Sequence, residues 1–372
     1  MKSTLLIISS LNSISPANYL IDAFELIGWD IVALSDVQSE KATHIDHGSV
    51  DLDHFVRLKN VNPDLILFVE GGEMGIFPVN FSKIDCPKFW WGIDTHNDYN
   101  KHLNISRLFD HSFIAQKKFV EDLKRDGVHS VSWLPLAYAT TESSDYSGPR
   151  EIDVAYVGST NWNIYPQRGE LLDSILEVHK NSFIGQCVPS EMFRKYEHSK
   201  IVFNFSPMND VNMRFFEAMG SGALLMTNRI YNNGADDLFH EGKDYLTYND
   251  TQDLLLKLNS VLNDQESLLA ISQNGQERVR SSHTYSHRVA EIIELTSTVD
   301  RKQTESHMTT SSILLSMGLL SDSMYFYFLA VVENQTGVKN NIIKFILSPL
   351  FRITLFSAEC FEVVARKLKR FR

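Results

Sequence analysis

Short apolar runs alternate along this chain with longer amphipathic stretches. Strands that are buried on both faces read as nearly continuous apolar runs, and helices that cover them show one apolar face. In the first half we predict strands at Leu5–Ile8, Ile31–Leu34, Leu65–Val69, Phe89–Gly92, His111–Ala115 and Val131–Leu134, with helices between them such as Ala17–Ile27 and Lys117–Arg125. The pattern predicts a parallel α/β domain.

A second α/β series follows a polar segment, Thr140–Arg150, which contains Ser, Gly and Pro and is interpreted as a linker. Its predicted strands are Asp153–Val157, Ser182–Gly185, Ile201–Phe205, Ala223–Thr227 and Tyr245–Thr247, and its predicted helices are Arg168–His179, Ser190–His198, Met213–Met219, Thr251–Leu262 and Gln265–Arg280. We therefore expect Rossmann-like domains at 1–145 and 150–300, a helical extension at 301–372, and ligand at the carboxyl ends of the strands.

Composition narrows the class of protein. The chain has 372 residues, 43% hydrophobic and 22% charged, and a formal net charge of −11, which argues against nucleic-acid binding. Its three cysteines are widely spaced, so neither a disulfide framework nor a zinc site is indicated. The apolar start reads as a first strand rather than a signal peptide, and we expect a cytoplasmic protein.

The stretch Asn212–Asn228 combines a helix start, a cation and a carboxylate. Arg214 and Glu217 lie one turn apart on the predicted helix, which ends at small residues before a buried strand. A helix N-terminus favours anions, an arginine binds a diphosphate, and a carboxylate accepts from ribose hydroxyls. This arrangement suits a nucleotide diphosphate; the alternative is a surface ion pair between Arg214 and Glu217.

Several motifs occur in the order found in one enzyme family. They are Phe109 to Gln116, Trp133 to Ala137, Asp153 to Ser159 followed by Arg168, Asn212 to Asn228, Leu238 to Gly242 and His283 to Arg288. Together they resemble the CgeB-like (spore-maturation type) glycosyltransferases, related to glycosyltransferase family 4, over roughly residues 60 to 295. The resemblance implies a GT-B fold and a metal-independent hexosyltransferase of bacterial polysaccharide biosynthesis that uses a nucleotide sugar and no cofactor.

The resemblance also implies roles for individual residues. Glu217 corresponds to the ribose-binding carboxylate, and Arg214 to the cation that contacts the diphosphate and stabilises it as it leaves. Gly158 lets the backbone approach the donor phosphates, and the matching motifs add Arg168 and Asn212 to the donor-binding residues. The related enzymes have a second carboxylate eight residues before Glu217, where this chain has Asn209 beside Asp210. This departure changes the predicted donor-sugar side.

Acceptor-side candidates follow two predicted strands of the first domain. Asp94 and His96 come after Phe89–Gly92, and Glu70 and Glu73 come after Leu65–Val69. A general base for the acceptor would come from such positions. The alternative is that Asp94 caps the next helix and that His96 makes a structural hydrogen bond.

An acidic and histidine-rich segment, His44 to His54, resembles a metal site only superficially. It contains Asp51-Leu52-Asp53, which is similar to the metal-binding acidic motif of a different glycosyltransferase fold. We interpret these side chains as helix caps in a solvated loop and expect no metal.

The C-terminal tail reverses the charge of the chain. Residues 339–372 carry eight basic side chains against two acidic ones, a net +6 that leaves −17 for the rest. Apolar residues from Ile342 to Phe351 fall at helical spacing, which is typical of a helix lying on an anionic membrane surface. The alternative is packing on the protein itself, a role that Ile313–Val332 could also fill.

Three functions remain open at this point. The preferred one is transfer of a sugar from a nucleotide diphosphate to a cell-surface glycan, lipid-linked or protein acceptor. The alternatives are a nucleotide-sugar epimerase or hydrolase on the same fold, and a non-catalytic scaffold that keeps the nucleotide site.

Overall fold

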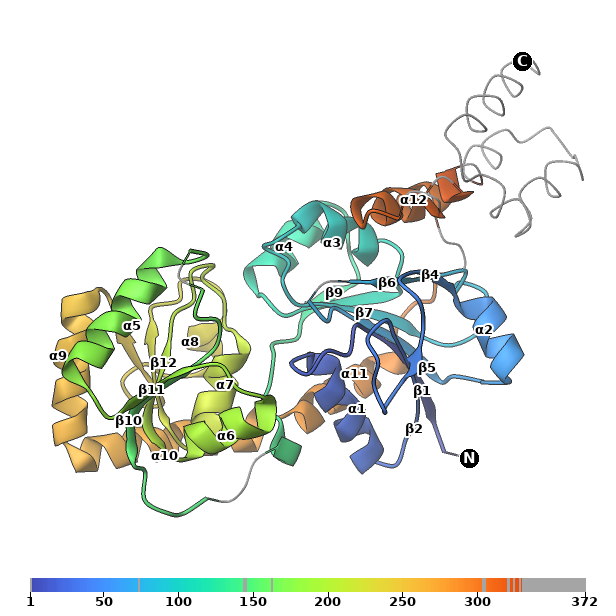
Figure 1. The fold of residues 1–372 in the computed structure, drawn as a ribbon. Coiled ribbons are helices and arrows are strands. Elements are labelled where there is room, and N and C mark those ends of the chain that lie inside the picture. The colour runs from blue at the N-terminus through green and yellow to red at the C-terminus, as the bar shows by residue number, and fades with distance from the viewer. Residues whose placement is uncertain are drawn as a thin grey trace, which may run out of the picture.

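The computed structural model describes residues 2–72, 74–142, 146–161, 163–302, 306–319, 322, 323, 325–327 and 329. Two parallel sheets dominate it (Figure 1). The first has seven strands in the order β3-β2-β1-β5-β7-β8-β9, and the second has five in the order β11-β10-β12-β13-β14. Helices cover both sheets, so two Rossmann-like domains form the GT-B fold that was predicted.

The N-terminal domain follows the predicted alternation of strand and helix. Its elements are β1 Thr4–Ile8, α1 Pro16–Leu26, β2 Asp30–Ser35, β3 Thr43–His44, β4 Gly48–Asp51, α2 Leu52–Lys59, β5 Leu65–Val69, β6 Ile76–Val79, β7 Lys88–Gly92, α3 Tyr99–Ser106, β8 His111–Ile114, α4 Lys118–Arg125 and β9 Val131–Trp133. Strands β4 and β6 pair as a separate two-stranded sheet.

The second domain begins at β10 after the linker. Its elements are β10 Ile152–Val157, α5 Pro166–Val178, β11 Ser182–Gly185, α6 Pro189–Glu197, β12 Ser199–Asn204, α7 Met213–Gly220, β13 Leu224–Asn228, α8 Ala235–Leu238, β14 Leu246–Tyr248, α9 Thr251–Asn263 and α10 Gln265–Ser282. Two further helices follow, α11 Tyr285–Thr296 and α12 His307–Ser316.

Alternate residues of the central strands face opposite layers of helices. In β10, Val154 and Tyr156 pack with α5 and α9, whereas Ala155 and Val157 pack with the layer that contains α6 and α7. This alternation explains the continuous apolar runs in the sequence, because both faces of each strand are buried. It also places α7 on the opposite side of the sheet from α5 and α9.

The chain returns to the first domain after completing the second. Helix α11 lies against α1, and the ring centroids of Tyr285 and Tyr19 are 5.2 Å apart. The Arg288 side chain donates to the backbone oxygens of Pro135 and Leu136 at 2.7 and 3.2 Å. Two motifs that are far apart in the sequence therefore meet at the junction between the domains.

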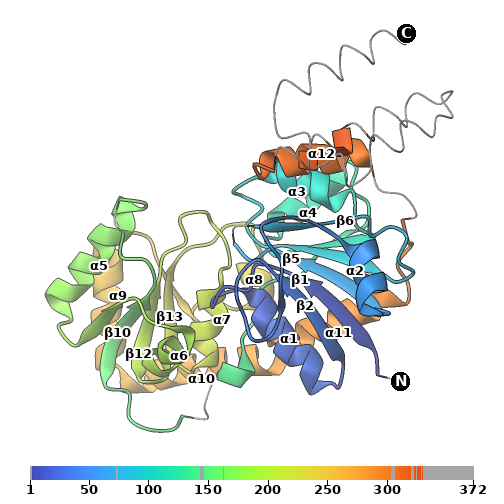
Figure 2. The same cartoon turned by 45° about the vertical axis from the view of Figure 1, so that its right-hand side comes forward.

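Helix α12 packs on α3 of the N-terminal domain (Figure 2). Ile313, Leu314 and Phe326 are buried in the same apolar cluster as Phe68 and Trp90 of that domain. The described part of Ile313–Val332 thus packs on the protein, as the alternative for this region anticipated. The predicted membrane-binding tail, residues 339–372, lies outside the described residues.

The predicted strands and helices agree with the structure to within two residues. No range was predicted for β3, β4, β6, α2, α3, α8 or α11, and α12 lies within the predicted helical extension. Among the residues that the structure describes, no helix has both the length and the apolar character that crossing a bilayer requires.

Candidate functional site

The carboxyl ends of β10 and β12 meet where the strand order of the second sheet reverses. Chain connections leave these two neighbouring strands in opposite directions, toward β11 and toward β13. Ligands of parallel α/β sheets bind at such a point. Helix α7 begins there, and its two phenylalanines, Phe215 and Phe216, are buried and fix it against the sheet.

Arg214 is held firmly by the protein at this point. Its Nη2 donates to the Val157 carbonyl at 2.7 Å, its Nη1 to Asn204 Oδ1 at 2.8 Å, and its Nε to the Tyr196 hydroxyl at 3.2 Å. The guanidinium also lies 4.6 Å from the centre of the Tyr156 ring. An arginine has five N–H groups, so two remain for a ligand.

Gly158 is required by this arginine. A Cβ atom at position 158 would lie 2.9 Å from Arg214 Nη2 and 2.7 Å from the Tyr156 hydroxyl. The backbone N–H of Gly158 donates to the Gly185 carbonyl at 2.9 Å. The missing side chain thus makes room for the guanidinium at the end of β10.

Glu217 lies one turn further along α7 and is 7% exposed. Within the described part of the chain, no donor makes a hydrogen bond to its carboxylate, and Arg214 is not within ion-pair distance. Burial raises the Glu217 pKa to about 7, partly offset by the charge of Arg214. The alternative of a surface ion pair is therefore wrong. Glu217 is a buried carboxylate without a hydrogen-bond donor among the described residues, an arrangement that is costly unless a ligand supplies one.

Arg168 is a second buried cation near the same strand end. Its Nε and Nη2 atoms are buried without a hydrogen-bond partner. The guanidinium carbon lies 5.1 Å from the centre of the Tyr165 ring and 5.8 Å from that of Tyr156. Tyr156 is thus near both arginines, and Arg168 keeps N–H groups available for an anion.

The loop between β12 and α7 carries the remaining donor-side candidates. Asn212 precedes α7 and donates from Nδ2 to Asn204 Oδ1 at 3.2 Å, while its own Oδ1 is buried without a partner. Asn209 uses both ends of its amide on the Tyr231 backbone, at 2.7 Å each. Asp210 accepts from the Ser206 hydroxyl.

Asp94 faces this loop from the N-terminal domain. Burial, followed by the charges of Glu70 and, more weakly, Asp210, raises the Asp94 pKa to about 6. The charge of His96 acts in the opposite direction. The charge of Asp210 in the C-terminal domain thus acts on Asp94 in the N-terminal domain.

Glu70 shapes the loop that carries Asp94. Its Oε2 accepts the backbone N–H groups of Ile93 at 2.6 Å and Asp94 at 2.9 Å, and its Oε1 lies 3.4 Å from His102 Nε2. Burial works against its ionised form, but His102 and the two N–H groups outweigh burial and lower the Glu70 pKa. Glu70 thus fixes a neighbouring loop from a buried position. Glu73 lies outside the described residues.

The alternatives for Asp94 and His96 have different outcomes. Helix α3 is capped by Asp98, whose Oδ1 accepts the Lys101 N–H, so Asp94 is not its cap. His96 Nδ1 does make a hydrogen bond, at 2.6 Å to Gln116 Nε2. His96 therefore has a fixed ring, a property that suits both a structural and a catalytic role.

A cavity of about 550 Å³ lies between the two domains. Its N-terminal wall comes from the loops after β1 and β2 and from α1, and Pro189 and Ser190 of α6 form the other wall. Tyr19 lines it and packs on Tyr285, whose pKa is held well above its usual value by burial and then by Tyr19 and Glu217. Neither Glu217 nor any other predicted site residue is among the residues that line this cavity.

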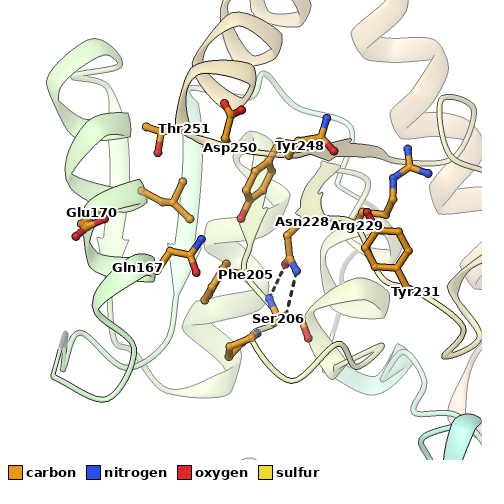
Figure 3. Close-up of a pocket in the computed structure, with 13 residues that line it drawn as sticks. Gln167, Glu170, Phe205, Ser206, Asn228, Arg229, Tyr231, Tyr248, Asp250 and Thr251 are labelled. Carbon is orange, nitrogen blue, oxygen red and sulfur yellow. Dashed lines mark hydrogen bonds between the residues drawn. The ribbon is translucent and has the colours of Figure 1, made fainter.

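A second cavity, of about 420 Å³, lies within the C-terminal domain at the ends of β12, β13 and β14 (Figure 3). Phe205, Ser206 and Tyr248 line it, and Asn228 makes two hydrogen bonds to the Ser206 backbone. None of the predicted site residues lines this cavity.

The segment from His44 to His54 is only in part the capping loop that was expected, because it includes strand β4 and the start of α2. Asp51 Oδ1 accepts the His54 N–H at 2.9 Å and caps α2, and its Oδ2 accepts from Asn80 at 2.7 Å. Among the described residues, no group of three or more histidine, cysteine, aspartate or glutamate side chains is placed to hold a metal ion.

Sequence reasoning missed the contribution of Tyr156, Tyr196 and Asn204. These residues contact Arg214. The two tyrosines lie within a predicted strand and a predicted helix, and no sequence motif identifies them as contacts of Arg214. Asn204 does have a signal, because it is a polar residue at the end of the apolar strand β12.

Comparison with known proteins supports the class that this geometry defines. Residues 145–294 match a family described as glycosyl transferase-like, a range that covers the C-terminal domain and part of α11. With the GT-B fold, this match supports a protein of the glycosyltransferase superfamily. No match was found among curated proteins.

Three solved structures share the fold. HepE of Anabaena, in complex with UDP and glucose, is 12% identical and covers 80% of this chain and 100% of its own, with a TM-score of 0.59. A glycosyltransferase from Rickettsia africae (11% identity, TM-score 0.57) and the sucrose-phosphate synthase of Thermosynechococcus elongatus (11% identity, TM-score 0.52) each cover 79% of this chain and 98% of their own. At these identities the likeness establishes the fold.

Proposed function

We propose that this protein is a metal-independent glycosyltransferase that moves a hexosyl group from a nucleotide diphosphate sugar to a glycan, lipid-linked or protein acceptor. The observation that carries the proposal is Glu217, a buried carboxylate without a hydrogen-bond donor beside the start of α7. Two ribose hydroxyls would supply those donors, and a carboxylate binds such a pair well.

The donor would lie along the C-terminal side of the crevice. Arg168 and the two free N–H groups of Arg214 would bind the diphosphate together with the first N–H groups of α7, and they would stabilise it as it leaves. The cavity of about 550 Å³ between the domains is large enough for a nucleotide base. Gly158 contributes by giving Arg214 its place.

Acceptor activation would fall to the loop after β7. Asp94, with a pKa of about 6, is mostly ionised at neutral pH and can accept the proton of an acceptor hydroxyl. His96 would orient the acceptor from its fixed position beside Gln116. On the opposite side, Asp210 would bind hydroxyls of the donor sugar, because the Asn209 amide is committed to Tyr231.

The test is a panel of nucleotide sugars that includes UDP-glucose, the ligand of one HepE structure. Release of nucleoside diphosphate is followed with and without bacterial cell-envelope extract. Release that depends on the extract supports transfer, whereas release without it indicates a hydrolase. Binding without release in either case indicates a scaffold, and no binding by any donor would contradict the proposal.

The proposal extends to location. We propose that residues 339–372 hold a cytoplasmic enzyme at the inner face of the cell membrane, near a lipid-linked or envelope acceptor, and that neither nucleic acid nor a cofactor takes part. The support is the net charge of +6 on this segment within a chain of −11.

A further inference from the structure

The two domains touch where the start of α4 and the end of β9 meet α8 and the loop before it. Lys117 Nζ and Asp237 Oδ1 are 2.5 Å apart across this contact. Gly234 lies so close to Trp133 that a Cβ atom there would be 2.4 Å from Cζ2 of the indole. The contact is therefore tight, and its centre excludes even a methyl group.

Asn233 lies inside this contact and is 1% exposed. Its Oδ1 accepts the backbone N–H of Lys118, in the first turn of α4, at 3.1 Å. Its Nδ2 donates to the Asn209 carbonyl at 2.6 Å. One buried amide thus bonds to both domains, and neither bond can be replaced by water without opening the contact.

Within the C-terminal domain, Asn233 lies beside two segments that are joined by two pairs of hydrogen bonds. The Asn209 amide exchanges two hydrogen bonds with the Tyr231 backbone, and the Asn228 amide exchanges two with Ser206, at 2.7 and 3.0 Å (Figure 3). The loop after β12 is therefore bonded at Ser206 to the end of β13 and at Asn209 to the loop after β13. Asp210 lies on the first of these loops.

We propose that Asn233 is a positioning residue for the transfer reaction. It ties the loop that carries Asp210 to the start of α4, and so sets the separation between Asp210 and Asp94 across the crevice. The inference rests on the proposed function for its catalytic consequence, but the mechanical link stands on the two hydrogen bonds alone.

The mechanical link is tested by hydrogen–deuterium exchange on the full chain. Asn233→Ala removes both bonds, so exchange should rise at residues 206–212 and at the start of α4. Asn233→Asp keeps an acceptor for the Lys118 N–H and loses the donor to Asn209, so exchange should rise mainly at 206–212. Asp237→Asn is the matched control, because it weakens the same contact at its exposed edge and should change neither segment. Unchanged exchange in Asn233→Ala at either segment would overturn the link.

The positioning role is tested on the same variants with UDP and UDP-glucose as probes. In Asn233→Ala, turnover should fall on the order of 10- to 100-fold, as expected for misplaced reacting groups, while the Kd for UDP stays unchanged. Lower turnover with an equal loss of UDP affinity would show a general structural defect and contradict positioning. If the wild-type protein binds neither probe, the choice of donor in the proposed function is at fault, and exchange still decides the link.

Discussion

Oε2 of Glu70 accepts the backbone N–H of Asp94 at 2.9 Å. One buried acid therefore holds the backbone of the acid that faces the crevice, and its negative charge also raises the Asp94 pKa. The same side chain fixes the position of the proposed base and tunes its proton affinity.

The first prediction separates these two effects with Glu70→Gln. The amide oxygen keeps an acceptor for the N–H groups, but the charge is lost, so the Asp94 pKa should fall below its present value of about 6. The acid limb of the kcat/KM profile for transfer should move to lower pH with it.

Glu25→Gln is the control for this prediction, since Glu25 is an exposed glutamate of the same domain. An acid limb that stays in place in Glu70→Gln would show that Asp94 is not the group that titrates.

The second prediction concerns the proposed ribose contact. Glu217→Ala should weaken nucleotide binding by about 1–3 kcal/mol, the usual loss for a hydrogen bond to a charged group. Calorimetric titration with UDP measures it, with Glu266→Gln on the exposed start of α10 as the control. Equal affinity of the wild type and Glu217→Ala would remove Glu217 from the site.

A third prediction follows from the Glu217 pKa of about 7, raised by burial from its usual 4.5. Because ribose hydroxyls donate to the ionised form, affinity for a nucleotide sugar should rise with pH through about 7. A nucleotide sugar has no terminal phosphate monoester, so its own charge does not change in this range. Affinity that falls with rising pH would contradict the assignment.

The same raised pKa has a consequence for stability. The folded protein binds the Glu217 proton more tightly than the unfolded chain does, so protonation of Glu217 raises the free energy of unfolding. This stabilisation is fully present below pH 4.5 and is lost as pH rises through about 7. Glu217→Gln should therefore gain stability relative to the wild type between pH 5 and pH 8, measured by chemical denaturation at both values.

A fourth prediction uses the room that Gly158 leaves. In Gly158→Ala, the new methyl group would meet Arg214 Nη2 at 2.9 Å and the Tyr156 hydroxyl at 2.7 Å, so the guanidinium must shift. Donor binding should weaken, as measured by calorimetric titration with UDP. Gly127→Ala on the other domain has open space around its Cβ, although its φ of +92° adds local strain, and it should leave donor binding unchanged.

The fifth prediction concerns the basic tail. Deletion of residues 338–372 should release the protein from anionic vesicles, and full-length binding should weaken as salt rises, because each basic residue contributes roughly 1 kcal/mol near such a surface. Vesicle flotation measures both effects. If the truncated protein instead aggregates or melts far earlier, the segment packs on the protein and the membrane proposal fails.

The sequence predicts the sheets well and the site only in part, for physical reasons. Strand β5, with its five apolar residues all buried, needs nothing beyond its own pattern, and the same holds for β10. Strand β3 has two exposed residues and forms only because β2 offers a free edge. No pattern along the chain encodes that pairing.

The site residues divide in the same way. The spacing of Arg214 and Glu217 identifies their helix, but it does not show that the two side chains are not paired. Arg214 instead bonds to Val157, Asn204 and Tyr196, which come from three other elements. For Asn209, the residue type alone does not show the role of the side chain. Its type suggests a weakened sugar contact, whereas its left-handed backbone (φ 58°) and two bonds to Tyr231 make it part of the loop framework.

Helix α11 has a consequence for how this chain can be built and rebuilt. Its residues Tyr285, Val289 and Ile292 are buried in a core shared with Tyr19 and Leu20 of α1, more than two thirds of the chain length away. The first domain cannot complete its core until α11 has been synthesised, so the second domain must leave the ribosome before the first can close. An engineered chimera that exchanges the donor half should therefore retain residues 285–296 of this chain and join the foreign segment before them.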